Sequence, residues 1–260
     1  MRVLSKTQAE WDLVESWIRS RAAKDRPIQI LEAGCGRFWP LKMGDIRFEL
    51  TGIDMDEAAL EARKTDYHDL HHAIVGDLRT ADLPSDRFDV IYCSYVLEHV
   101  HGAEQVLERF VRWLRPGGIL VVRVPDRSSI QGFTTRLTPF WFHVMFYRYV
   151  HGMREAGKPG FAPYPTVYDK VIASPGMHAF ARKHGLVIQD EVLHGEYRRG
   201  NRLMKSLITA YAKAVEGASF GRVHAKAANI TFIVEKPRVA PEHLQRPAVA
   251  TNTPAMMSTG

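Results

Sequence analysis

Residues 30–36 read Ile-Leu-Glu-Ala-Gly-Cys-Gly, an apolar run that ends in two closely spaced glycines. The run predicts a strand. Gly34 and Gly36 predict a sharp turn at its end, and a ligand can approach this backbone closely because neither residue has a Cβ. A dinucleotide-binding fingerprint would carry a third glycine at position 39, where a helix meets the pyrophosphate. Position 39 is Trp, and Glu32 precedes the loop, so the loop favours a cationic or hydroxyl-rich ligand over a phosphate.

Carboxylates and a Glu-His pair stand at the ends of the apolar runs that follow. Asp54 ends the second run, about twenty residues after the loop, where a carboxylate can accept two hydrogen bonds from a ribose diol. Asp77 ends the third run. A fourth run, 88–94, leads into Tyr95-Val96-Leu97-Glu98-His99-Val100, and Arg115-Pro116-Gly117-Gly118 breaks a helix before a fifth run. Alternating strands and helices predict a parallel sheet with right-handed crossovers.

Taken together, these motifs resemble the class I S-adenosylmethionine (SAM) methyltransferases. The resemblance covers roughly residues 28–126 and is to the branch whose fourth strand is followed by Leu-Glu-His-Val, which includes ubiquinone- and menaquinone-pathway and other small-molecule methyltransferases. It implies an α/β, Rossmann-like, doubly wound sheet of seven strands in the order 3-2-1-4-5-7-6, with the last strand antiparallel. It also implies SAM as the cofactor and S-adenosylhomocysteine as its product.

The resemblance places a cofactor site over the carboxyl ends of the strands. The expected contacts are Glu32, Gly34 and Gly36 at the methionine part, Asp54 on the ribose hydroxyls, Met55 on the adenine face, Asp77 on the adenine amino group with Leu78 beside it, and Ser94 and Tyr95 at the sulfonium. Each residue has a structural alternative, because Asp54 and Asp77 could cap helices and Met55 could lie in the core. Four consecutive strand ends with the expected residue type favour the cofactor site.

The chain departs from the family pattern in its glycine loop. The third glycine of the family's loop is Phe38 here, and only about ten residues, 37–46, separate the first two strands, which is short for a crossover helix. Binding through the first two glycines is still expected. The shape of the methionine end of the site is the part that this departure changes.

His99 is a candidate catalytic residue by resemblance. In ubiquinone-pathway O-methyltransferases with Leu-Glu-His-Val, the Glu and His take part in a divalent-metal site or in substrate deprotonation. That metal site uses another carboxylate three residues before the Glu, where this chain has Tyr95. With one fewer hard oxygen ligand we expect no metal site. Alternatively, Glu98 caps the helix that it opens, and His99 is a hydrogen-bonded structural residue.

The acceptor atom follows only by analogy. Enzymes that methylate amino groups of nucleobases or glutamine carry Asn/Asp-Pro-Pro-Tyr/Phe after the fourth strand, where this chain has Ser94-Tyr95-Val96-Leu97. The resemblance therefore implies a SAM-dependent methyltransferase acting on a small-molecule, glycan-linked or lipid-linked acceptor, most often at a hydroxyl oxygen and secondly at carbon. A different reading is a SAM-fold binding module without turnover, in which Arg37, Phe38 and Trp39 obstruct the cofactor. Glu32, Asp54 and Asp77 favour the enzyme.

A first insertion, 127–170, is expected to cover the substrate. Within it, Pro139 and Gly152 delimit a helix of about four turns that carries six aromatic residues almost all round. The helix is a lid packed on the domain, an aromatic wall around the acceptor, or both, since in the family the segment after the fifth strand covers the pocket. Under the second reading the substrate contacts are Phe140, Trp141, Tyr147 and His151, with His143 as a second candidate catalytic residue.

A second insertion, 197–226, carries the chain's positive charge. It holds seven Lys and Arg residues against Glu216 alone, whereas the whole chain holds 35 Lys and Arg against 29 Asp and Glu. We expect a helix over 201–216 with Leu203, Leu207, Tyr211 and Ala214 on one stripe, and with Arg202, Lys205, Lys213 and Glu216 on another face. The basic face is either solvated or contacts anionic lipid headgroups or an acidic substrate. Nucleic acid is disfavoured because no nucleic-acid-binding module accompanies it.

Composition supports this organisation. At 260 residues and 45% hydrophobic content, the chain suits one domain over 1–236 followed by a disordered tail over 237–260. Two cysteines, Cys35 and Cys93, exclude a disulfide framework and suit a reducing cytoplasm. Residues 1–26 read as a charged amphipathic helix and not as a signal peptide, and no apolar stretch approaches the ~18 residues of a membrane span. We therefore expect a cytoplasmic protein, with weak contact to the inner face of the membrane as a further option.

Overall fold

A computed structural model of the chain describes residues 2–4, 7–149, 152–158, 163–164, 166–195, 202–220, 222–223 and 227–238. The strands are β1 (Arg2–Leu4), β2 (Ile28–Ala33), β3 (Phe48–Asp54), β4 (His72–Val75), β5 (Phe88–Ser94), β6 (Leu114–Pro125), β7 (Val187–His194) and β8 (Asn229–Glu235). The α-helices are α1 (Thr7–Arg19), α2 (Glu57–Ala62), α3 (Ala103–Trp113), α4 (Ile130–Leu137), α5 (Phe140–Tyr149), α6 (Ser174–Lys183) and α7 (Arg202–Ala218).

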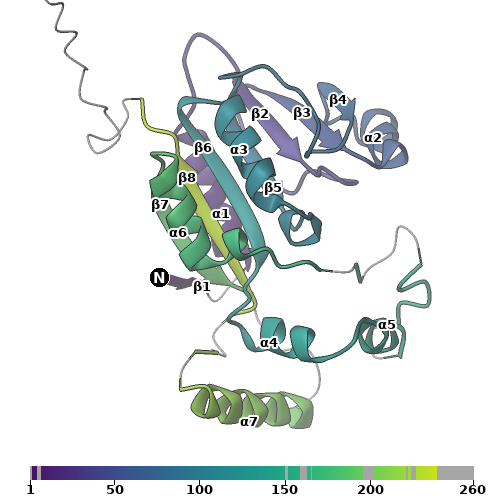
Figure 1. The fold of residues 1–260 in the computed structure, drawn as a ribbon. Coiled ribbons are helices and arrows are strands. Elements are labelled where there is room, and N and C mark those ends of the chain that lie inside the picture. Colours follow the sequence, from purple (N-terminus) through teal and green to yellow (C-terminus); the bar gives the residue numbers. More distant parts are fainter. Residues whose placement is uncertain are drawn as a thin grey trace, which may run out of the picture.

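The strands form one sheet in the order β1-β7-β8-β6-β5-β2-β3-β4 (Figure 1). Pairing is parallel except along β8, which is antiparallel to both β6 and β7. The predicted doubly wound sheet of seven strands is therefore confirmed in order and direction. The eighth strand, β1, was not predicted because three residues carry no period. It forms because the edge of β7 supplies its partners, with Arg2 opposite Val192 and Leu4 opposite His194.

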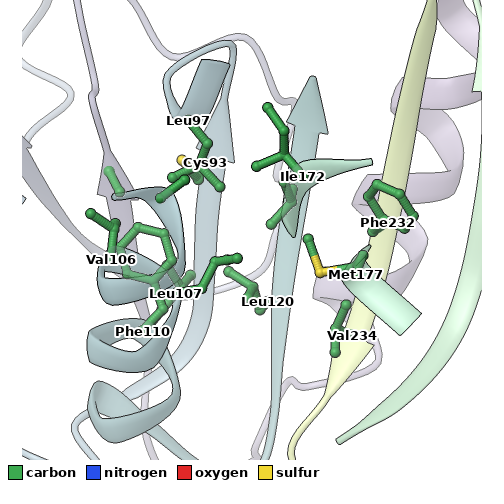
Figure 2. Close-up of a cluster of buried hydrophobic side chains, with 14 of the residues drawn as sticks. Cys93, Leu97, Val106, Leu107, Phe110, Leu120, Ile172, Met177, Phe232 and Val234 are labelled. Carbon is green, nitrogen blue, oxygen red and sulfur yellow. The ribbon is translucent and has the colours of Figure 1, made fainter. Parts of the chain in front are cut away.

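Two layers of helices bury the sheet. On one face, α3 and α6 pack against β5, β6 and β8 around Phe110, Leu120, Met177 and Phe232 (Figure 2). On the other face, α1 packs through Val14 and Ile18. Fully burying each of these apolar side chains stabilises the fold by about 1.5–3 kcal/mol. Cys35 and Cys93 are buried and free.

The N-terminal helix and the helix expected to open at Glu98 have other boundaries than predicted, and a third helix, α2, ends in an unusual turn. Helix α1 ends at Arg19 and not near residue 26. Hydrogen bonds from Arg21 N–H to Ile18 O and from Ala22 N–H to Arg19 O, three residues apart, close its last turn. Helix α2 gives way to a π-helical turn, Arg63–Tyr67. Leu97–His99 forms a separate 3-10 turn, and α3 begins only after Gly102, so Glu98 does not cap that helix.

The two insertions differ from expectation in their packing. Helix α4 was not predicted. Helix α5 has no buried residue, and its role as a lid stays a prediction. In α7, Ala212 is buried and Val215 packs beside it, whereas Tyr211 is exposed. The predicted stripe is therefore displaced by one residue where the structure describes its side chains.

The crossover between β2 and β3 contains no helix, as its length predicted. An irregular segment does the covering instead, with Leu41 and Met43 buried and Trp39 packed against the same cluster as α1. Helix α1 fixes this segment, because the Glu15 carboxylate accepts from the Lys42 N–H at 2.7 Å. The sheet face is thus closed without the usual crossover helix.

The glycine loop after β2 packs tightly against the segment after β5. Gly34 has φ +70°, and a Cβ on it would lie 2.2 Å from Cγ2 of Val96. Gly36 also has positive φ, at +52°, but a Cβ there would meet nothing within 4 Å. Gly34 is therefore needed for both its backbone conformation and close packing, whereas Gly36 leaves the loop open on its outer side.

We predict that Gly34→Ala destabilises the protein by about 2–4 kcal/mol, because left-handed strain of about 1 kcal/mol adds to an overpacking cost of about 1–3 kcal/mol. Gly36→Ala, the matched control, should cost only the strain of about 1 kcal/mol. Denaturant unfolding of both variants measures the difference. Val96→Ala should restore part of the loss in the Gly34→Ala background, and equal stabilities of the two glycine variants would contradict the packing argument.

Candidate functional site

Four parallel strands end together at one edge of the sheet (Figure 1). In register, Ala33 of β2 lies opposite Ile53 of β3 and Cys93 of β5, and Asp54 lies opposite Val75 of β4. The residues expected to bind a cofactor lie within three positions of these residues along the chain. The structure therefore brings the predicted strand-end residues to one edge, as the sequence predicted.

Asp54 organises the glycine loop. Its Oδ2 accepts from the Gly36 N–H at 2.8 Å, and its Oδ1 accepts from the Asp56 N–H at 2.9 Å. Each carboxylate oxygen can accept a second hydrogen bond. Asp54 can therefore hold the loop and still accept from the two hydroxyls of a ribose. Asp56, not Asp54, caps α2 through the Ala59 N–H.

Glu32 lies beneath the loop, only 4% exposed. Its Oε2 accepts from Nη2 of Arg63 at 2.9 Å. The fully buried Arg63 also donates to Asp69 and to the carbonyl oxygen of Cys35, both at 2.8 Å. Burial raises the pKa of Glu32, and the Arg63 guanidinium opposes that rise. In this arrangement Glu32 supports the loop from below, and its contact with a ligand stays a prediction.

The predicted adenine contacts lie at the same edge with different exposures. Met55 is 69% exposed, whereas Leu78 is buried. Asp77 accepts from the backbone and side chain of Arg79, and this pairing lowers the pKa of the Asp77 carboxyl. The carboxylate is therefore ionised, but a ligand would share it with Arg79.

The Arg123 side chain of β6 contacts both Ser94 and Tyr95. Arg123 Nη1 donates to Ser94 Oγ at 3.1 Å, and its guanidinium lies 5.2 Å from the centre of the Tyr95 ring. Tyr95 has φ +57° and donates its N–H to the Arg123 carbonyl at 2.8 Å. Burial raises the pKa of the Tyr95 phenol to about 12, so it stays protonated. The buried carboxylate of Glu10 on α1 pairs with Arg123 at 2.8 Å.

Glu98 and His99 follow in the 3-10 turn. Glu98 is 2% exposed, and its Oε2 has no hydrogen-bond partner among the described residues. Burial raises the pKa of Glu98 to about 7. Nε2 of His99 lies 3.9 Å from Oε1 of Glu98, and the His99 ring packs edge-on against Tyr164 at 5.7 Å between centres. This pair has the chemistry of a proton acceptor near neutral pH.

The predicted substrate residues on α5 are not brought to this pair. His143 Nε2 lies 3.0 Å from Thr138 Oγ1, so this ring nitrogen joins α4 to α5. Phe140 and Trp141 are exposed and Tyr147 is half-buried, on a helix that lies apart from the sheet (Figure 1). His151 lies outside the described residues. The roles of these residues as substrate contacts stay predictions.

Sequence reasoning missed two arginines, Arg63 and Arg123. Arg63 gave no signal, because it stands among polar residues in a helical pattern. Arg123 did give one, since it is a lone charge within the apolar run Val121-Val122-Arg123-Val124. A charge in such a run predicts a buried partner. Across the described part of the chain, no group of three His, Cys, Asp or Glu residues is placed to hold a metal ion.

Comparison with known proteins gives the family. A family model described as a methyltransferase domain matches residues 8–163. A probable S-adenosylmethionine-dependent methyltransferase of Mycolicibacterium smegmatis is 34% identical over 115 residues, which are 43% of this chain and 44% of the relative. A malonyl-[acyl-carrier protein] O-methyltransferase of Enterobacter lignolyticus is 28% identical over 44% of this chain and 45% of its own. The chain thus matches less than half the length of these two relatives.

A ubiquinone biosynthesis O-methyltransferase of Pseudomonas aeruginosa is 27% identical over 182 residues, 67% of this chain and 71% of the relative. Among solved structures, YcgJ of Bacillus subtilis superposes with a TM-score of 0.52 at 14% identity, over 87% of this chain and 97% of its own. A SAM-dependent methyltransferase of Thermotoga maritima gives 0.50 at 14% identity, over 88% and 94%. These two structures show the fold. The match to more than half of the chain, on the strands that carry the site, shows that this protein belongs to the methyltransferase-domain family, whose cofactor is S-adenosylmethionine.

Proposed function

We propose that this protein transfers a methyl group from SAM to a hydroxyl oxygen of a small-molecule, glycan-linked or lipid-linked acceptor. The observation that carries the proposal is the buried Glu98 carboxyl, which has an unpartnered oxygen among the described residues and lies beside His99 at the end of β5. A proton acceptor is needed when the methylated atom carries a proton, as a hydroxyl does. The names of the ubiquinone and malonyl-[acyl-carrier protein] relatives, both O-methyltransferases, support the same choice.

The residues at the strand ends fit SAM. Asp54 has acceptor capacity for the ribose hydroxyls, and the open outer side of Gly36 lets a ligand reach the loop backbone. Exposed Met55 and Phe38 offer apolar surface at the same edge. Bound there, SAM supplies an electrophilic methyl group on a sulfonium.

In this mechanism, Asp54 binds and orients the cofactor, and Tyr95, fixed by Arg123, borders the reacting centre. Placement of the acceptor oxygen close to ~3 Å from the methyl carbon supplies most of the acceleration. The Glu98–His99 pair takes the hydroxyl proton as the oxygen–carbon bond forms and the carbon–sulfur bond breaks. The electron pair of the broken bond would stay on sulfur, so the products would be the methyl ether and neutral S-adenosylhomocysteine.

Two alternatives remain distinct in outcome. Carbon methylation would use the same cofactor contacts but would remove a proton from carbon. A binding module without turnover would bind SAM and transfer nothing.

We place the enzyme in the cytoplasm as part of the proposal. Separately, no helix in the described ranges is long and apolar enough to cross a bilayer.

We predict that Asp54→Ala weakens SAM binding by at least about tenfold. The carboxylate would make two charge-assisted hydrogen bonds to the ribose, and losing them should cost about 1.5–3 kcal/mol. Calorimetric titration with SAM and with S-adenosylhomocysteine measures the effect. Asp82→Ala is the control, because Asp82 is an exposed carboxylate paired with Arg112 away from the loop. Unchanged affinity in Asp54→Ala would remove Asp54 from the site.

Turnover tests the reaction itself. Incubation with methyl-labelled SAM and a panel of phenols, catechols and glycan or lipid alcohols should give label in an oxygen-linked product. Since Tyr95 replaces a carboxylate of the family's metal site, the rate should survive chelator treatment and should not rise with Mg²⁺. Label at carbon would favour C-methylation. A chelator-sensitive rate restored by Mg²⁺ would show that a metal takes part.

Glu98→Gln should change how stability depends on pH. The pKa of Glu98 is raised from 4.5 to about 7 by burial, so the folded state favours the protonated form. Its contribution to stability is full below pH 4.5 and is lost as pH rises through 7. Gln cannot ionise, so the variant should gain up to about 3 kcal/mol relative to the wild type between pH 5 and pH 8.

Thermal unfolding at the two pH values measures this gain. Glu61→Gln, an exposed carboxylate on α2, is the control and should show no such difference. Under the proposed chemistry, Glu98→Gln should also lower turnover while leaving SAM affinity unchanged. Parallel pH dependences of wild type and Glu98→Gln would refute the buried, protonated carboxyl.

A further inference from the structure

Helices α4, α5 and α7 form a separate group beyond the end of β6 (Figure 1). We call residues 127–158 together with 202–223 the basic aromatic lobe. A small cluster holds its base together, with Ile130 of α4 against Ala212 of α7 and Val223. The Thr134 hydroxyl also meets the Tyr211 hydroxyl at 3.3 Å. Helix α7 therefore packs on α4, and this cluster includes no residue of α5.

The lobe gathers exposed apolar side chains. No residue of α5 is buried. Eight large hydrophobic residues between positions 137 and 153 are at least 40% exposed, and they are Leu137, Phe140, Trp141, Phe142, Met145, Phe146, Tyr149 and Met153. Such a concentration on one segment is uncommon on a protein surface that faces only water and marks a contact surface.

Polar contacts hold this helix in place. His143 Nε2 lies 3.0 Å from Thr138 Oγ1, and Arg148 Nε donates to the Ala156 carbonyl at 3.0 Å. These bonds join α5 to the segments before and after it. Helix α5 is thus bonded to its neighbouring segments while most of its aromatic rings stay exposed, which favours a partner that covers them.

The charge of the lobe identifies the partner's chemistry. By sequence, the lobe holds nine of the chain's 35 Lys and Arg residues but only two of its 29 Asp and Glu residues. The remainder of the chain is close to neutral. Exposed basic residues accompany the rings, among them Arg136, Arg154 and Lys213. Basic residues beside Trp, Tyr and Phe are the composition that binds the interface of an anionic bilayer.

We propose that the basic aromatic lobe docks on an anionic phospholipid surface, with α5 lying in the headgroup region and its aromatic side chains reaching the acyl boundary. Docking goes beyond the proposed reaction, because it requires neither SAM nor an acceptor. The lobe is connected to the candidate site through the chain, because it follows directly from β6, whose Arg123 contacts Ser94 and Tyr95 there.

Vesicle binding tests the proposal on the full chain. Wild-type protein should co-sediment with vesicles of phosphatidylglycerol and phosphatidylcholine at low salt, less at high salt, and weakly with phosphatidylcholine alone. Trp141→Ser/Phe146→Ser should weaken partitioning about tenfold or more on the anionic vesicles, since each ring loses its apolar burial. Arg154→Glu/Lys213→Glu should weaken it about tenfold as well.

Matched controls keep the outcome specific. Tyr67→Ser removes an aromatic ring that is 58% exposed on the π-helical turn, and Lys64→Glu reverses an exposed charge beside it. Neither should change vesicle binding. Trp141 fluorescence should shift to shorter wavelength on anionic vesicles and be quenched by brominated acyl chains, and Trp141→Phe should abolish both signals.

Titration with S-adenosylhomocysteine on the same preparations separates this proposal from the proposed reaction. Variants that lose vesicle binding but keep that affinity support a docking surface. No co-sedimentation of wild type at low salt would overturn the proposal whatever the enzyme's activity. It would also be overturned by a dimer in sedimentation velocity that Trp141→Ser/Phe146→Ser dissociates, because a second copy would then cover the rings.

Discussion

The buried guanidinium of Arg63 is the interaction on which the cofactor end of the fold depends. It is fully buried and joins the end of β2 and the glycine loop that follows it to the segment before β4, through Glu32, the Cys35 carbonyl and Asp69. Removing one partner of such a pair leaves an uncompensated buried charge, which typically costs about 3–5 kcal/mol. The π-helical turn that begins at Arg63 belongs to the same arrangement, because the ordinary helix α2 ends one residue before it. The position of the glycine loop therefore depends on the helical segment of α2 and the π-helical turn, which follows the next strand, β3.

A second buried arginine plays the corresponding part at the acceptor end. Arg123 donates to Tyr92 and Ser94, pairs with Glu10 and lies under the ring of Tyr95. Nearby His194 shares Thr231 with this group, and burial beside Arg123 lowers the pKa of His194 to about 4, so it stays neutral. One charge of each sign therefore remains buried, and they neutralise each other. The N-terminal helix α1 supplies Glu10, which couples that helix to the segment after β5.

Sequence reasoning succeeded where a motif is local and failed where a contact is remote. Gly34, Asp54 and Asp77 could be placed because a strand end is visible in the residues around it and parallel strands end at one edge. The partners of Arg63 and Arg123 lie up to 113 positions away along the chain, and no local sequence pattern indicates such contacts. The exposure of α5 was equally hidden, because a helix with aromatics all round reads as buried unless its surroundings are known. Strand β1 needed the edge of β7 to exist at all.

Two departures from the family pattern, the altered glycine loop and the missing crossover helix, compensate for each other. Trp39 does not fill the cofactor side of the loop, because its ring packs edge-on against Tyr92 at 5.4 Å, in the cluster beneath the irregular crossover. Tyr92 in turn accepts from Arg123 at 2.9 Å. Phe38, which stands where the family has its third glycine, is 62% exposed. The short crossover thus uses Trp39 as core in place of a helix and leaves Phe38 as the aromatic that can shape the methionine end of the site. Obstruction of the cofactor by this loop would accordingly have to come from Phe38 or the exposed Arg37, and not from Trp39.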